Sequence, residues 1–199
     1  MHPNFKHGIE LLASRRYQEA ITTLSSVLDA APDHALALAS RAAAYRMLGD
    51  DGPAMQDASR AIAVQPDLAW AYATRGALHR LQKNYVEALA DLDRAIQLAA
   101  DYEWCIAGRG ETYRSMGELE RALEDLNRAL DLNPRNDWAL MSRCATYLDA
   151  HQDELALTAF REAVNAHPDG DWALDQSELT YRLMGKDLTR FLHDLEADA

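Results

Sequence analysis

The sequence is poor in β-branched aliphatic residues, because Val and Ile together account for only nine of its 199 residues. Strands in sheets are rich in such residues, so this scarcity excludes a β-sandwich, a β-barrel or a parallel sheet. The chain has instead 36 Ala and 28 Leu, which are two of the strongest helix formers. The composition therefore predicts an all-α protein, and 48% hydrophobic residues supply enough material for a sizeable core.

Other scarce features exclude whole classes of protein. The only cysteines, Cys105 and Cys144, form neither a disulfide framework nor a CxxC pair. No apolar run approaches the ~18 residues of a membrane span, and the N-terminal apolar stretch carries charges, unlike a signal peptide. Nine Gly and six Pro are too few for a disordered linker. We therefore expect a cytoplasmic protein that is not inserted in a membrane.

Several residue types recur with one period of 34 residues. The residues that share this spacing are Trp70, Trp104, Trp138 and Trp172; Arg41, Arg75, Arg109 and Arg143; Asp57, Asp91 and Asp125; and, with one gap, Pro32, Pro66, Pro134 and Pro168. Because independent residue types agree on the period, the chain is predicted to be an array of repeated units. The predicted units are 1–34, 35–68, 69–102, 103–136 and 137–170, followed by a partial sixth unit, 171–199, that caps a single domain.

Each unit is predicted to contain two helices. In the fourth unit, Ile106, Arg109, Gly110 and Tyr113 follow the i, i+3, i+4, i+7 spacing of a packed helix face. Small residues recur where the paired helices are expected to cross closely, in two series: Gly8, Ala42, Gly76, Gly110 and Cys144; and Ala20, Ala54, Ala88, Ala122 and Ala156. A bulky side chain in either series would push the helix axes apart.

These landmarks resemble those of tetratricopeptide repeat proteins, whose unit is a 34-residue helix–turn–helix. The resemblance covers residues 1–170, and the Arg75-Gly76 and Arg109-Gly110 pairs resemble the bacterial style of the repeat. It implies a right-handed α-solenoid in which the first helices of the repeats line a concave groove and the second helices lie outside.

The periodic arginines of the first helices are predicted to be structural. A half-buried guanidinium needs a carboxylate beside it, and the Asp series of the second helices has the same period. We therefore expect Arg41 to pair with Asp57, Arg75 with Asp91 and Arg109 with Asp125. Arg143 is the exception, because Ala159 takes the place of the aspartate.

Residue patterns for catalysis and cofactors are missing from the sequence. It contains no phosphate-binding glycine motif, no GxSxG, no HExxH and no calcium loop. The cysteines have no His or Cys neighbours at metal-ligand spacing, so both are predicted to be packed small residues. We therefore expect no enzyme activity, no cofactor and no metal.

Two rows of side chains are predicted to border the groove. One row, near the start of each first helix, contains the tryptophans Trp70, Trp104, Trp138 and Trp172; the other, ten residues later, contains the arginines Arg46, Arg80, Arg114 and Arg182. Small residues lie between the rows, about 15 Å from one row to the other. Two alternatives to ligand binding remain open. The tryptophans could pack on the turns between repeats, and the arginines could pair with acidic neighbours.

The predicted function is a scaffold or adaptor that binds a partner segment in this groove. Indoles and guanidinium groups favour a protein or peptide segment with apolar and acidic residues. The alternative is a structural module that self-associates through the tryptophan surface, so a homo-oligomer is possible. A net charge of −12 argues against nucleic acid as a partner.

Overall fold

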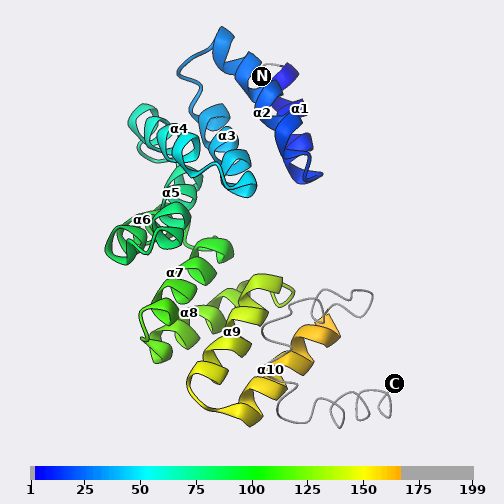
Figure 1. Cartoon of the computed structure of the whole chain (residues 1–199), viewed down its shortest axis with the longest axis vertical. Helices are drawn as coiled ribbons and strands as arrows, with labels where there is room; N and C mark the ends of the chain where they lie inside the picture. The colour runs from blue at the N-terminus through cyan, green and yellow to red at the C-terminus, as the bar shows by residue number, and fades with distance from the viewer. Residues whose placement is uncertain (1–2, 167–199) are drawn as a thin grey trace. The chain divides into compact units, whose positions relative to one another are not determined.

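The structure is a computed structural model that describes residues 3–166, and within them it contains helices and no strand (Figure 1). The helices are α1 (Pro3–Ala13), α2 (Tyr17–Ala30), α3 (Ala35–Leu48), α4 (Asp51–Val64), α5 (Ala69–Leu81), α6 (Tyr85–Leu98), α7 (Glu103–Ser115), α8 (Leu119–Leu132), α9 (Asp137–Asp149) and α10 (Asp153–Ala166). The prediction of an all-α protein is confirmed. The partial unit 171–199, with Trp172 and Arg182, lies outside the described residues.

The helices follow the 34-residue period of the sequence. The odd-numbered helices from α3 onward begin at Ala35, Ala69, Glu103 and Asp137, and the even-numbered helices begin at Tyr17, Asp51, Tyr85, Leu119 and Asp153. Each series is spaced by 34 residues, so the chain has the predicted helical-repeat fold. The exact limits of the five units remain a prediction.

In the turn within each helical hairpin, the residue at one fixed position of the repeat adopts the left-handed backbone conformation. The residues there are Arg15, Gly49, Lys83, Gly117 and His151, with φ between 57° and 81°. Only glycine adopts this conformation without a steric cost, so three of the five turns carry strain at a non-glycine residue. The sequence signal is visible only at the two glycines.

Replacing Lys83 with glycine should stabilise the protein, because it removes the strain of a left-handed L-residue. The gain is expected to be about 0.5–1 kcal/mol, since the greater entropy of glycine in the unfolded chain offsets part of it. Urea denaturation of Lys83→Gly measures this change, and Gly49→Ala is the reciprocal control, expected to destabilise by about 1 kcal/mol. A loss of stability in Lys83→Gly contradicts the assigned turn conformation.

Close packing within the hairpins occurs at the predicted small residues. The described members of both small-residue series are buried, and α1 packs on α2, α3 on α4, α5 on α6 and α9 on α10. A Cβ atom added to Gly76 would lie 3.0 Å from Leu92 Cγ and 3.2 Å from the Ala88 carbonyl oxygen. At Gly8 it would lie 2.7 Å from Leu24 Cδ2. The helices therefore approach to a distance that leaves little or no room for a larger side chain.

Gly76→Leu should destabilise the α5–α6 hairpin by about 1–3 kcal/mol, because the new side chain overpacks the contact with α6. Gly52→Leu is the matched control, since nothing lies within 4 Å of a Cβ placed at Gly52. Hydrogen exchange should show loss of protection in α5 and α6 of the Gly76 variant only. If the two substitutions destabilised the protein equally, the close approach of α5 and α6 at Gly76 would not be what excludes a larger side chain.

Ion pairs between the helices of a hairpin occur where the period predicts them. Arg41 Nε donates to Asp57 Oδ2 over 2.7 Å, and Nη2 donates to Oδ1 over 2.9 Å. Arg75 makes the same two-bonded contact with Asp91, at 2.7 and 2.8 Å. The hydrogen bonds to aspartate raise the pKa of both arginines, although burial opposes the shift. Both pairs are the ones predicted, so the structural role of Arg41 and Arg75 is confirmed.

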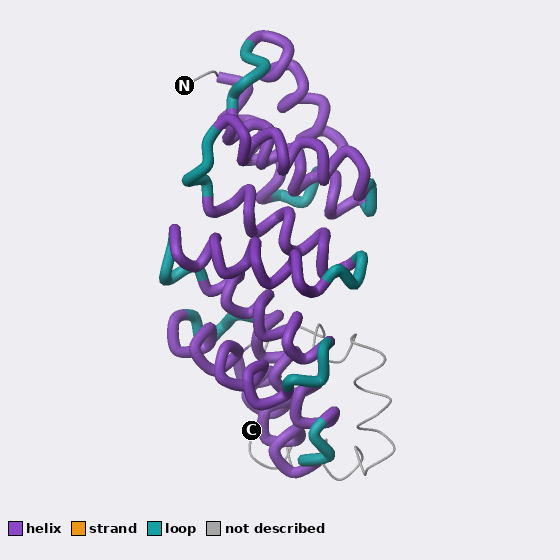
Figure 2. The backbone as a smooth tube through the Cα atoms, turned by 90° about the vertical axis from the view of Figure 1, so that its left-hand side faces the viewer, coloured by secondary structure: helices purple, strands orange, loops and turns teal. Residues whose placement is uncertain are grey.

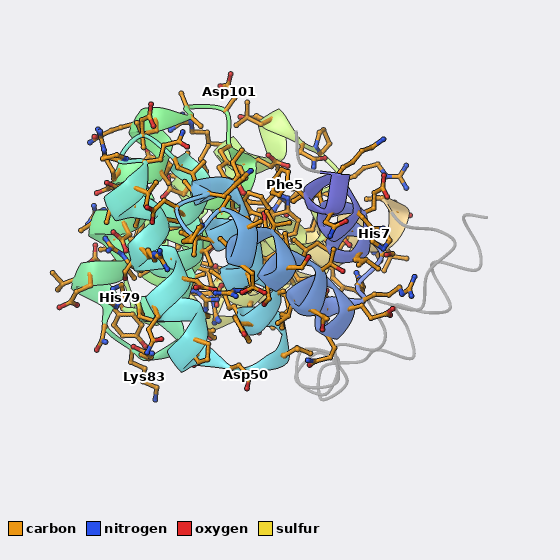
Figure 3. All side chains as sticks on the ribbon, turned by 90° about the horizontal axis from the view of Figure 1, so that it is seen from above. Phe5, His7, Asp50, His79, Lys83 and Asp101 are labelled. Atoms are coloured by element: carbon orange, nitrogen blue, oxygen red, sulfur yellow. The ribbon has the colours of Figure 1, made fainter. Side chains whose placement is uncertain are left out.

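The helices form two compact units, one ending at Thr112 and the other beginning at Tyr113. In the first unit, Asp50 and Lys83, which lie in turns within hairpins, are found at one edge, and Asp101, which lies between hairpins, at the opposite edge (Figure 3). Figure 2 shows the same alternation of turns along this unit. One edge of the unit therefore carries the turns within hairpins and the other the turns between them.

Each unit has an apolar core of its own. Leu24 and Leu38 are fully buried in the first unit, and Phe160 is fully buried in the second, against Cys144 and Ala156. No helix among the described residues is both long and apolar enough to cross a bilayer.

Candidate partner-binding site

The candidate site in the first unit lies on α3 and α5, which contact each other. Leu36 and Trp70 occupy equivalent positions near the helix starts, and Arg46 and Arg80 occupy equivalent positions near the ends. Of these residues, Arg46 and Arg80 lie close enough for the charge of one to act on the other.

Arg46 and Arg80 place two positive charges close to each other. Both side chains are partly buried, and Arg46 Nε is inaccessible to solvent and has no hydrogen-bond partner among the described residues. Burial lowers the pKa of Arg46, and the positive charge of Arg80 lowers it further. An anionic group bound at this pair would reduce the repulsion between the two guanidinium groups.

Tyr102 is a neighbour of Arg46 that no sequence pattern indicates. Burial is the main cause that raises the pKa of the Tyr102 phenol to about 12, and the charge of Arg46 acts in the opposite direction. The equivalent positions hold His34, Leu68 and Asn136, so no periodic signal marks a tyrosine here. His34 and Asn136 instead cap helices, by accepting hydrogen bonds from Ala37 N and Ala139 N.

The tryptophans differ in how far they are exposed. Trp104 is 49% exposed, which is high for an indole, whereas Trp70 and Trp138 are partly buried. Trp70 and Trp104 belong to the first unit and Trp138 to the second. Among the tryptophans within residues 3–166, Trp104 alone therefore presents about half of its surface, and the role of the tryptophans in binding remains a prediction.

The small residues between the two rows are less exposed to solvent than the helix geometry predicted. Ala39 and Ser40 are fully buried and Thr74 is 4% exposed, while Ala43 and Ala73 are partly exposed. The reason is that α3 contacts both α1 and α5, so the neighbouring first helices cover the flanks of this face. A ligand therefore meets a narrow strip of small residues rather than the whole predicted face.

Arg114, in the second unit, has an acidic neighbour. Its Nη1 atom donates to Asp149 Oδ2 over 2.6 Å, and about a quarter of each side chain is exposed. This is the acidic pairing that the sequence leaves open as an alternative to ligand binding. Asp149 lies at the end of α9, where its periodic equivalents are Met47, Leu81 and Ser115, so no recurring signal marks it in the sequence.

The other two arginines of the structural series are Arg109, whose pairing with Asp125 remains a prediction, and Arg143. Arg109 Nη1 donates to Asp93 Oδ1 over 2.6 Å. Arg143 donates to Asn127 and to Glu162. The prediction that Arg143 departs from the series is confirmed.

The described residues contain no group of His, Cys, Asp and Glu side chains suited to hold a metal ion. Both cysteines are buried, and burial raises the pKa of each thiol to about 12. The Cys144 thiol donates to the Ala156 carbonyl oxygen over 3.3 Å. Both residues therefore pack as small side chains and are poor nucleophiles in the folded protein.

At pH 8 both thiols should react with a disulfide reagent much more slowly in the folded protein than in urea, because they are buried and protonated. Cys144→Ser leaves Cys105 as the reporter of the first unit, and Cys105→Ser leaves Cys144 as the reporter of the second.

Above pH 9 the thiols of the unfolded chain ionise while those of the folded protein do not. The free energy of unfolding should therefore fall as the pH rises toward 12. Equal reaction rates with and without urea would contradict this burial.

Comparison with known families places the chain in the class of helical-repeat proteins. Two family models match, both described as tetratricopeptide repeat, over residues 5–73 and residues 105–136. These matches of 69 and 32 residues cover 101 of 199 residues. The chain therefore belongs to the tetratricopeptide repeat family. The bacterial style of its Arg-Gly pairs remains a prediction.

Solved structures show the same fold. A thermophilic tetratricopeptide repeat protein of Thermus thermophilus, TTC0263, is 22% identical, with a TM-score of 0.77 over 92% of this chain and 96% of that one. PilW, a type IV pilus biogenesis factor, is 20% identical, with a TM-score of 0.75 over 94% and 92%. YrrB, described as having an unusual peptide-binding site, is 19% identical, with a TM-score of 0.62 over 89% and 91%. Comparison with curated protein sequences gives no significant match.

Proposed function

We propose that this chain is a non-catalytic, cytoplasmic scaffold or adaptor that binds an acidic and apolar segment of a partner protein. The proposed binding surface in the first unit includes Arg46, Arg80 and Trp104. No nucleic acid, membrane or cofactor takes part in this proposal.

The observation that carries the proposal is the pair of neighbouring guanidinium groups of Arg46 and Arg80. Holding two like charges close together on a half-buried surface costs free energy, which a carboxylate bound between them would offset. The net charge of −12 makes the chain as a whole repel an acidic ligand. Electrostatic attraction would therefore favour this site over the rest of the surface.

Two further observations support a protein segment as the ligand. The exposed indole of Trp104 offers apolar and stacking surface of the kind enriched at binding hot spots. YrrB, which shares the fold, is described as a protein with a peptide-binding site. Trp70 belongs to the same unit as Trp104, whereas Arg114 and Trp138 in the second unit, and Trp172 and Arg182 outside the described residues, remain predicted contacts from the sequence alone.

Arg46→Gln should weaken binding of acidic segments by about tenfold, because it removes one of the two charges that attract the carboxylate. The experiment is a peptide array of acidic and apolar segments, followed by titration of the bound peptides at two salt concentrations. Binding to the variant should depend less on salt than binding to the unmodified chain.

Arg60→Gln is the matched control, because Arg60 is exposed on α4 and pairs with Asp33 at 2.9 Å. It removes the same charge away from the proposed surface and should leave binding nearly unchanged. If the two variants lose affinity equally, the attraction is not local to Arg46 and Arg80, and the proposed site is wrong.

Trp104→Ala should reduce binding by ~2 kcal/mol, as expected for an indole at a hot spot. Val86→Ala is the control, since Val86 is 75% exposed but lies on the second helix α6.

Light scattering after size exclusion tests the alternative function, which is self-association. A dimer that Trp104→Ala converts to a monomer would favour self-association through the tryptophan surface over capture of a partner segment.

A further inference from the structure

The charge pattern of the second helices changes in α10. Two periodic positions carry an acid and a base in α4, α6 and α8; the acids are Asp57, Asp91 and Asp125, and the bases are Arg60, Arg94 and Arg128. In α10 the first position is Ala159 and the second is Glu162. The carboxylate has therefore moved by one helical turn toward the surface.

This exchange alters the hydrogen bonding of Arg143. In the hairpins of Arg41 and Arg75, the arginine Nε donates to the periodic aspartate at 2.7 Å. Arg143 Nη2 donates to Glu162 instead, and Nη1 donates to Asn127 Oδ1 at 3.1 Å. Its Nε atom is left without an acceptor among the described residues. The missing acceptor is the one that an aspartate at position 159 would supply.

A pocket of about 380 Å³ lies beside this guanidinium, between α8, α9 and α10. Its lining combines donors, acceptors and apolar side chains: Arg143 and Asn127; Asp131 and Glu162; Leu130, Pro134 and Leu140. The volume lies at the lower end of the range for sites that accept a small ligand or side chain. Leu140 and Arg143 line the pocket from the first helix α9, and none of the seven lining residues is a predicted residue of the proposed binding site.

The lining selects the chemistry of an occupant. A carboxylate would approach Asp131 and Glu162, and an ammonium group would approach Arg143, so each meets a like charge. A carboxamide offers a carbonyl oxygen to Arg143 or Asn127 and an N–H donor to Asp131, while its methylene chain contacts Leu130 and Leu140. Asp131 is exposed and can accept this hydrogen bond.

We infer that this pocket binds a glutamine or asparagine side chain of a partner polypeptide. Asn127, Asp131, Pro134 and Glu162 are exposed, so the pocket is open and suits a protruding side chain better than an enclosed small molecule. With Ala159 in place of the periodic aspartate, the Nη atoms of Arg143 reach Asn127 and Glu162, which both line the pocket, while its Nε atom is inaccessible to solvent.

The test compares four probes of similar length: the N-acetyl methylamides of glutamine, glutamate, methionine and lysine. Each is titrated into the full chain while the Nε–Hε resonance of Arg143 is followed by NMR.

The glutamine probe should shift this resonance saturably. It should bind roughly threefold more tightly than the glutamate probe, which is the factor expected for an exposed like-charge contact. Preference for the glutamate, lysine or methionine probe, or no saturable shift up to the solubility limit, overturns the inference.

Ala159→Asp should abolish the shift, because the new carboxylate is expected to accept from Nε and Nη2 of Arg143, as Asp57 does from Arg41, and so to draw the guanidinium group away from the pocket lining. Thr158→Asp is the matched control, since it adds the same charge at an exposed position of α10 and should preserve binding. Equal behaviour of the two variants overturns the inference.

Asp131→Asn provides a second test that does not depend on tolerance of a buried aspartate, because Asp131 is exposed. Removing this carboxylate should reduce or reverse the roughly threefold preference for the glutamine probe over the glutamate probe. An unchanged preference overturns the role assigned to Asp131 in recognising the amide.

Discussion

The close approach of the two helices in each hairpin is the constraint on which the rest of the structure depends. Gly76 illustrates it, because its backbone lies against Leu92 and Ala88 with little room for even a Cβ atom. This contact fixes which face of the first helix is packed. Arg75, one residue earlier, consequently reaches Asp91 on the second helix. Arg80, farther around the same helix, lies beside Arg46 instead.

The same residue type therefore serves two purposes, and the position of a carboxylate decides between them. All three nitrogen atoms of the Arg41 guanidinium group donate hydrogen bonds, two to Asp57 and one to Ser25, and Asp57 neutralises its charge inside the hairpin. Arg46, five residues later, retains an unpaired Nε and lies close enough to Arg80 for their charges to repel. A guanidinium without a periodic carboxylate is the better placed ligand contact, since its donors are not committed to the packing of its own hairpin.

Much of the fold could be predicted because its determinants repeat. Gly76 and Asp91 each belong to a series with a 34-residue period, and this shared period identified the helical hairpins and their ion pairs. Features that occur once in the chain could not be predicted this way. Tyr102 and Asp149 lie beside two predicted arginines, yet no equivalent residue occurs elsewhere, and their contacts depend on side-chain positions that no pattern encodes.

Departures from the repeat are therefore where a distinct function can arise in such a chain. A residue of the packed series, such as Gly76 or Asp91, is tied to the packing of its own hairpin, so changing it costs stability before it alters recognition. Ala159 and Glu162 break the period together and preserve an ion pair to Arg143, while leaving Arg143 Nε without an acceptor. A single loss of the aspartate would have left a half-buried guanidinium without its carboxylate. The paired exchange avoids that cost, and it directs the guanidinium group of Arg143 toward two residues of the pocket lining without dismantling the hairpin.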